Sequence, residues 1–363
     1  MSDGKIAIVT ASDARYLPAA CCLLKSAWDN LTDKQDISLF LVICDVGRRD
    51  QQQAEQFFCE RNIPTEIIVA DDVANSLRPI NQRWPKSAYL RLYFDTIFDR
   101  DIERLVYFDA DMRIRESLHA LLNVPLRGAP VGAVHDFIYY VTGNIHRRRR
   151  DLFLGADAPY LQSGVMVFDW PATLADGGLP RARQFLERYP DRCQEAPDQD
   201  ALNAVFKGKW TPLDPRWNLH ETYLMFGGSL KPFIEHYTST KPWSRRRWPA
   251  WQNAAAWYTR ELAGTTWADF VSPQSFFDRA RARAAFLKFR CLPHLHDALV
   301  KYVPFARKAR DEAINEVFPW APKRRNDVEE MARALLAEAE QRCPRLLPPE
   351  AVLAQRIRSA CRI

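Results

Sequence analysis

Short apolar runs alternate with helical patterns along the first hundred residues of the chain. Residues 6–10, 38–43 and 66–69 are apolar segments with the length of buried strands. Residues 17–28 and 50–61 lie between them and repeat apolar positions at helical spacing. This alternation predicts an α/β fold, in which a mostly parallel central sheet has helices on both faces.

Ligand-binding residues of such a sheet are expected just beyond the carboxyl ends of its strands. Ala11, Ser12 and Asp13 follow the first predicted strand, and Asp71 and Asp72 follow the third. No Gly-x-Gly-x-x-Gly segment follows any of these strands, which argues against a dinucleotide fold of the dehydrogenase type.

The pattern changes near residue 265. Before that point, residues 88–97 are predicted to form a helix that carries Arg91, and residues 131–134 and 165–168 to form strands. After it, the sequence becomes helical and basic and ends in a predicted surface helix. We therefore predict a main domain over residues 1–265, a mostly helical C-terminal extension over residues 266–363, and a helix at residues 328–341.

Two carboxylates close an apolar run that extends from Arg104 to Asp111. Side chains alternate along a strand, so Asp109 and Asp111, separated only by Ala110, are expected to point to the same side. Two such oxygen ligands suit Mg²⁺ or Mn²⁺ and leave coordination positions for phosphate oxygens. A bare Asp-x-Asp is also common in solvated turns and helix caps, so its context has to decide.

Composition and cysteine usage exclude several classes of protein. With 363 residues, 47% hydrophobic and 26% charged, the chain has the composition of a globular protein. It lacks a run of eighteen apolar residues, and its first apolar stretch is too short for a signal peptide, so we expect a cytoplasmic or peripheral protein. None of the eight cysteines forms a Cys-x-x-Cys pair, which argues against zinc-ribbon and thioredoxin-like sites.

The net charge of +6 is unevenly distributed. Residues 276–310 mix nine Lys or Arg with two Asp and many large apolar side chains. This mixture suits an anionic membrane surface, and equally an amphipathic helix that packs on the main domain. Without a nucleic-acid-binding signature, no nucleic-acid partner is predicted. A second basic run, at residues 146–150, is predicted to be a solvated loop.

Four further segments each have an ordinary structural explanation, but their order is informative. They are Ser87-Ala88-Tyr89-Leu90-Arg91-Leu92, residues 160–168 with Gln162-Ser163-Gly164, residues 197–203 with Asp198-Gln199-Asp200, and residues 236–243 with His236 and Lys241-Pro242-Trp243. Together with the Asp-x-Asp, the chain over residues 5–255 resembles glycosyltransferase family 8 of the GT-A fold. These retaining nucleotide-sugar transferases include bacterial lipooligosaccharide galactosyltransferases and glycogenin.

The resemblance implies a set of site residues. Mn²⁺, or Mg²⁺, would be held by Asp109, Asp111 and His236. Donor contacts would come from Ala11, Asp13, Arg91, Asp109, Ala110, Asp111, Gln162, Ser163, Asp198, Gln199 and Lys241. Asp136 would lie on the acceptor side, where His135 and the aromatic residues of 243–257 are candidates for stacking on a sugar.

The chain departs from the family pattern at three places. Gln162-Ser163-Gly164 stands where the family usually has Asn-Ala-Gly, so the donor-sugar contact has to be re-aimed. The segment from His236 to Lys241 is one residue shorter and lacks the family's glycine. Arg15 replaces a small polar residue near the expected ribose site.

The implied activity is retaining transfer of galactose or glucose from a UDP-sugar to a saccharide, such as a lipid-linked lipopolysaccharide core. Arg91, Asp198 and Gln199 are the expected catalytic residues. Gln199 is a poor nucleophile, which favours same-face attack, and Asp198 as a transient nucleophile is the alternative. Two other functions remain open: a metal-dependent phosphohydrolase acting on nucleotide sugars, and an inactive module that binds UDP-sugars.

Overall fold

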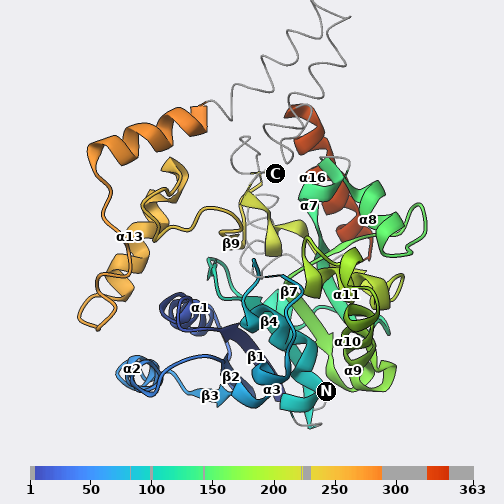
Figure 1. Ribbon diagram of the computed structural model, residues 1–363, viewed down its shortest axis with the longest axis horizontal. Coiled ribbons are helices and arrows are strands. Elements are labelled where there is room, and N and C mark those ends of the chain that lie inside the picture. The colour runs from blue at the N-terminus through green and yellow to red at the C-terminus, as the bar shows by residue number, and fades with distance from the viewer. Residues whose placement is uncertain are drawn as a thin grey trace, which may run out of the picture.

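A seven-stranded sheet forms the centre of the protein (Figure 1). The computed structural model describes residues 5–81, 83–98, 101–141, 144–221, 223, 230–287 and 325–342. The strand order is β3-β2-β1-β4-β7-β6-β8, and only β7 runs against its neighbours. The strands are β1 (Lys5–Ser12), β2 (Ile37–Ile43), β3 (Thr65–Val69), β4 (Ile102–Asp109), β6 (Val131–His135), β7 (Leu161–Asp169) and β8 (Trp210–Pro212).

Helices cover both faces of this sheet, as the strand–helix alternation predicts. Ile8 of β1 packs in the core on the side of α1 and α2, whereas Ala7 and Val9 pack in the core on the opposite side. Both faces are therefore apolar, which is why the strands read as continuous apolar runs. The flanking helices are α1 (Leu17–Asp29), α2 (Arg48–Cys59), α3 (Asp71–Ser76), α6 (His119–Leu122), α9 (Trp170–Asp176), α10 (Gly178–Arg188) and α11 (Pro197–Phe206).

A small second sheet joins two segments that are far apart in the sequence. It consists of β5 (Met112–Ile114) and β9 (Ile234–His236), which pair antiparallel with Met112 opposite His236. Because β5 begins directly after Asp111, this pairing brings the His236 ring next to the end of β4. The short helical segments η2 (Pro190–Arg192), η3 (Pro215–Asn218) and η4 (Pro249–Trp251) connect the larger elements.

The helix predicted for residues 88–97 is interrupted in the structure. It consists of α4 (Lys86–Tyr89), a 3₁₀ segment η1 (Leu90–Tyr93) and α5 (Phe94–Ile97). Arg91 lies in the 3₁₀ segment, where its Nε donates to Ala88 O at 3.0 Å and its side chain is buried. The tighter 3₁₀ turn occurs where the guanidinium makes long-range contacts. Apolar periodicity does not reveal such contacts.

The basic run at residues 146–150 is helical, so the prediction of a loop is wrong, although His146, Arg147 and Arg150 are exposed as expected. It belongs to α8 (Ile145–Asp151), and the side chain of Arg148 is buried. Arg148 Nη1 donates to Asp200 Oδ2 at 2.8 Å, and Tyr160 Oη donates to the other oxygen of the same carboxylate at 2.7 Å. A buried arginine needs such a partner, and Asp200 on α11 supplies it.

The described residues of the C-terminal extension form two parts, one packed on the main domain and one with exposed apolar side chains. Helix α16 (Arg325–Arg342) packs on α7 (Phe137–Val141) and buries Leu335 in a cluster with Phe137 and Ile138 (Figure 1). After α13 (Gln252–Glu261), the helical residues 276–287 instead expose Phe276 and Phe277 by 72% and 81%. The rest of the predicted basic region, residues 288–310, lies outside the described residues. A domain boundary at residue 265 stays a prediction.

Candidate active site

The predicted site residues line one cavity of about 650 Å³. It lies where β1 and β4 end, and because β7 runs antiparallel its first residues reach the same edge of the sheet. The residues assigned to the metal ion and the donor, together with Asp136, contribute to its wall: Ala11, Asp13, Arg91, Asp109, Ala110, Asp111, Asp136, Gln162, Ser163, Asp198, Gln199, His236 and Lys241.

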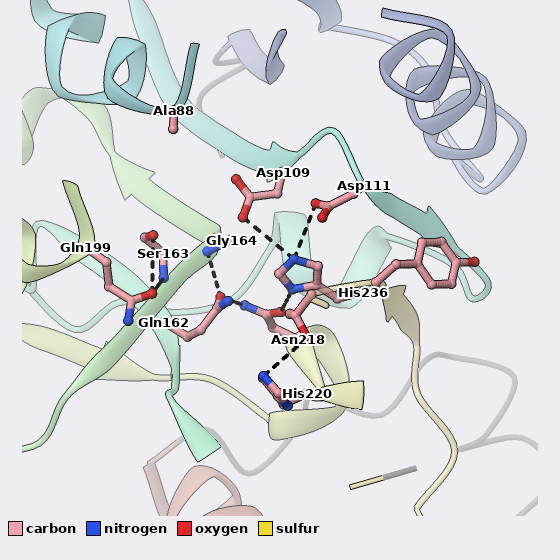
Figure 2. A network of polar contacts seen from close by, with 12 residues as sticks. Ala88, Asp109, Asp111, Gln162, Ser163, Gly164, Gln199, Asn218, His220 and His236 are labelled. Atoms are coloured by element: carbon pink, nitrogen blue, oxygen red, sulfur yellow. Dashed lines mark hydrogen bonds and ion pairs between the residues drawn. The ribbon is translucent and has the colours of Figure 1, made fainter. Parts of the chain in front are cut away.

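Asp109, Asp111 and His236 form a candidate metal centre (Figure 2). One ligand atom from each lies within 4.8 Å of the other two. His236 Nε2 is 3.4 Å from Asp111 Oδ1 and 3.7 Å from Asp109 Oδ2. Two carboxylates and one imidazole are a donor set that suits Mn²⁺ or Mg²⁺, so the residues present fit such an ion.

Two cations compensate the carboxylates of this centre. Arg91 Nη2 is 2.6 Å from Asp109 Oδ1, and Arg91 Nε is 3.2 Å from Asp198 Oδ2. Lys241 Nζ is 2.5 Å from Asp111 Oδ2. Although burial alone would raise the pKa of Asp111, the Lys241 ammonium and then His236 hold that pKa below its ordinary value. Two fixed cations are therefore paired with three carboxylates of the cavity, which leaves negative charge for a divalent cation to neutralise.

Tyr107 supports this arrangement from within β4. It lies two residues before Asp109 and therefore on the same face of the strand. Its hydroxyl donates to Asp109 Oδ1 at 2.8 Å, and the Arg91 guanidinium lies 4.4 Å from its ring centroid. Sequence reasoning missed Tyr107, although the alternation that paired Asp109 with Asp111 pointed to it as well.

The side chain of Gln199 connects Ser163 on β7 with Asp136, the residue that follows β6. Its Oε1 accepts from the Ser163 amide at 3.0 Å, and its Nε2 donates to Asp136 Oδ2 at 2.8 Å. These bonds fix the orientation of the amide, since a backbone N–H can only donate. Burial raises the pKa of Asp136 to about 6, against the opposing hydrogen bond from Gln199.

His220 and Glu221 also line the cavity and were not predicted. Burial raises the pKa of Glu221 to about 7, although its hydrogen bond with Ser239 and the charge of Lys241 oppose this shift. Burial, and then the charges of His236 and Lys241, lower the pKa of His220 to about 3. No sequence signal marks this pair, because it precedes β9 in a segment without regular periodicity.

Several sequence candidates lie elsewhere. Asp71 and Asp72 do not line the cavity; they open α3, where Asp71 accepts from the Asp45 amide at 2.8 Å.

His135 is buried and packs edge-on against Trp210, which contradicts a role in stacking on a sugar. Trp243 likewise packs against Tyr16, Tyr258 and Phe270. Among the described residues, the tryptophans that line the cavity are Trp84 and Trp248.

The fold and the site together define a class. The mostly parallel central sheet with flanking helices is the GT-A fold of solved glycosyltransferases. The structure aligns with that of the galactosyltransferase LgtC, solved with donor and acceptor sugar analogs, with a TM-score of 0.61 and 20% identity. The alignment covers 72% of this chain and 96% of LgtC.

Sequence comparison then shows the family. The profile described as "Glycosyl transferase family 8" matches residues 7–247, and the chain belongs to this family. General stress protein A of Bacillus subtilis is 25% identical over 60% of this chain and 74% of its own length. A lipopolysaccharide 1,2-glucosyltransferase of Escherichia coli is 26% identical over 53% of this chain and 58% of its own length. The protein is thus a glycosyltransferase, as the sequence motifs predict.

Proposed function

We propose that this protein is a metal-dependent, retaining hexosyltransferase that moves galactose or glucose from a UDP-sugar to a saccharide acceptor. The acceptor we propose is a lipopolysaccharide or lipooligosaccharide core, the class that the names of several relatives indicate. One observation carries the proposal: Asp109, Asp111 and His236 converge in the same cavity as Arg91, Asp198, Gln199 and Lys241.

The charge of each side chain determines the role that we assign to it. Asp109, Asp111 and His236 would hold the divalent ion, which supplies Lewis-acid stabilisation of the diphosphate leaving group. Lys241 adds a fixed cation for the departing phosphate oxygen, and each such electrostatic contribution is worth about 3–4 kcal/mol. Ala11 and Asp13 line the cavity at the carboxyl end of β1, where Ala11 pairs with Asp109 of β4, and are assigned to the uridine.

Retention of configuration is proposed to follow same-face attack. The C1–oxygen bond to the diphosphate breaks, the acceptor hydroxyl oxygen forms the new bond on the same face, and its proton passes to the departing phosphate oxygen. Gln199 is proposed to act as an oriented amide dipole near the sugar. It does not act as the nucleophile, because an uncharged amide is a poor nucleophile and its oxygen accepts a hydrogen bond from Ser163. Asp198 remains the alternative nucleophile, but its Oδ2 is engaged by Arg91 at 3.2 Å.

The activity itself is tested with metal-free protein, a panel of nucleotide sugars, and an oligosaccharide core acceptor. With Mn²⁺ present, we expect one UDP-hexose to give a glycosylated acceptor whose new linkage keeps the donor's α configuration, read by mass spectrometry and NMR. Nucleotide release that no acceptor accelerates would instead identify a phosphohydrolase. UDP-sugar binding without turnover would identify an inactive module.

Replacing Asp198 with asparagine separates the two routes. In same-face attack Asp198 only supports Arg91, so Asp198→Asn is expected to keep measurable turnover, reduced by about 10- to 100-fold. A double-displacement route requires the carboxylate as nucleophile, and the variant would then lose turnover completely. Rapid-quench mass spectrometry of the wild type provides the second readout, because a glycosyl-enzyme adduct on Asp198 would contradict same-face attack.

Attachment to an anionic membrane surface is proposed for the helical residues 276–287. What supports it is the exposure of Phe276 and Phe277 together with the exposed arginines 279, 281 and 283. Among the described residues, no helix is both long and apolar enough to cross a bilayer. This proposal is compatible with the packing of α16, which involves a different part of the extension.

Vesicle co-sedimentation tests the attachment. The double variant Phe276→Ser/Phe277→Ser is expected to lose most of its binding to vesicles that contain phosphatidylglycerol, because about 0.8 kcal/mol is lost for each CH₂ group no longer buried. Phe153→Ser is the matched control, since Phe153 is also exposed, by 49%, but lies outside this helix. Equal binding of the double variant and the wild type would exclude this attachment.

A further inference from the structure

A chain of hydrogen bonds runs from the β7 backbone to the candidate metal-binding histidine (Figure 2). The amide of Gly164 donates to Gln162 Oε1 at 2.7 Å, and Asn218 Nδ2 donates to the same oxygen. On its other side, Asn218 Oδ1 lies 2.7 Å from His236 Nδ1. Gln162 and Asn218 therefore connect a strand of the large sheet to β9 of the small one.

The direction of this chain is set by its first member. A backbone N–H can only donate, so the Gln162 atom next to Gly164 has to be the oxygen. That oxygen needs a second donor, which makes the facing Asn218 atom the nitrogen and turns Asn218 Oδ1 towards His236. His236 Nδ1 then has to carry the hydrogen, which leaves the lone pair on Nε2, the nitrogen that faces Asp109 and Asp111.

We propose that Gln162 and Asn218 are positioning residues that fix the tautomer and ring orientation of His236 for the divalent ion. A metal-bound imidazole is commonly held in this way by a partner on its other nitrogen. The proposal also changes the role of Gln162. Both lone pairs of its Oε1 are taken by Gly164 and Asn218, so this oxygen supports the metal centre instead of contacting the donor sugar.

The length of the glutamine side chain is what allows this connection. The Gln162 side chain is long enough to bring its amide oxygen to Asn218 on η3. Neither partner is on the surface: Asn218 and His236 are both buried. A buried amide in an apolar setting costs stability unless its hydrogen bonds are made, so the chain is held in one arrangement.

The experiment measures Mn²⁺ binding to the metal-free protein by electron paramagnetic resonance, without a sugar substrate. Asn218→Leu and Gln162→Met are expected to weaken Mn²⁺ binding by about 10- to 100-fold, the usual effect of losing a partner of a ligating histidine. Gln162→Glu keeps the accepting oxygens and is expected to bind Mn²⁺ nearly as well as the wild type. Gln51→Met is the control, because Gln51 is a buried amide outside the cavity that donates to Val46 O at 2.8 Å.

A second readout reports the tautomer directly. Long-range ¹H–¹⁵N NMR of metal-free protein distinguishes hydrogen on Nδ1 from hydrogen on Nε2. We expect the Nδ1–H form for His236 in the wild type and a shift towards the Nε2–H form in Gln162→Met. The signal is assigned by its loss in His236→Gln. A merely structural role of Gln162 would leave the tautomer unchanged.

The proposal rests on the metal centre of the proposed function. Its failure can be distinguished from a failure of the proposed transfer reaction. If Gln162→Met binds Mn²⁺ as the wild type does and only donor turnover falls, Gln162 contacts the donor and the positioning role is wrong. If wild-type protein does not bind Mn²⁺, the metal centre and this proposal both fail. If the variants weaken Mn²⁺ binding as expected but wild type transfers no hexose, only the proposed function fails.

Discussion

The Asp111→Asn variant is expected to lose about 100- to 1,000-fold in kcat and most of its affinity for Mn²⁺. Asp111 supplies one of the three ligand atoms that lie within 4.8 Å of one another, and its replacement by a neutral amide removes both charge and basicity. The folded state should also lose some stability, because the lowered pKa of Asp111 shows that its charge is favoured in the fold and the change leaves Lys241 without its carboxylate partner. Turnover with Mn²⁺ titration and the thermal midpoint measure the two effects.

Asp95→Asn is the matched control for that experiment. Asp95 pairs with Arg183 at 2.6 Å and has 15% of its side chain exposed, compared with 14% for Asp111. It lies on α5, outside the cavity wall. The control therefore removes a carboxylate from an equally buried ion pair, and we expect unchanged Mn²⁺ affinity. Full Mn²⁺-dependent turnover in Asp111→Asn would contradict the proposed metal centre.

A single methyl group at Gly164 is expected to disrupt the same centre. A Cβ at this position would lie 2.7 Å from Asp109 Oδ2, 2.8 Å from His236 Cε1 and 2.9 Å from Gln162 Oε1. Real Cβ atoms essentially never approach other atoms so closely, so the ligands have to move. Overpacking of this kind costs about 1–3 kcal/mol, and a displacement of about 1 Å costs about 100-fold in rate. Gly164→Ala should therefore lose Mn²⁺ affinity and activity together.

Gly155→Ala provides the comparison for this substitution. A Cβ on Gly155 meets nothing within 4 Å, and the residue does not have a positive φ. Its replacement should leave Mn²⁺ binding, turnover and the thermal midpoint close to those of the wild type. If Gly164→Ala behaves like Gly155→Ala, the close packing of β7 under Asp109 and His236 is not required for the site.

Local periodicity predicted the parts of the fold that depend on neighbouring residues. The strands and helices around the first half of the sheet follow from apolar spacing, because each apolar face has to be buried. The same alternation predicted that Asp109 and Asp111 share a side, which their convergence on His236 confirms. It failed at residues 88–97, where the contacts of Arg91 with Asp109 and Asp198 accompany a 3₁₀ segment.

The prediction for residues 146–150 missed the helix and the burial of Arg148 for a related reason. Composition alone does not distinguish an exposed arginine from a buried one with a carboxylate partner. Asp200 lies on α11, and only the fold brings it within 2.8 Å of Arg148. Glu221 and Tyr139 also line the cavity. Only the fold places them there, because no spacing in the sequence points to them.

The sequence by itself determined the α/β layering, the paired carboxylates at the end of β4 and, through its ordered motifs, the resemblance to the family. These properties are encoded in short segments or in the order of segments along the chain. Only the tertiary structure decided that Met112 pairs with His236, that antiparallel β7 brings Gln162 and Ser163 to the ends of β1 and β4, and that Asn218 faces the imidazole. Such contacts depend on strand pairing and packing between distant segments, which no local pattern specifies.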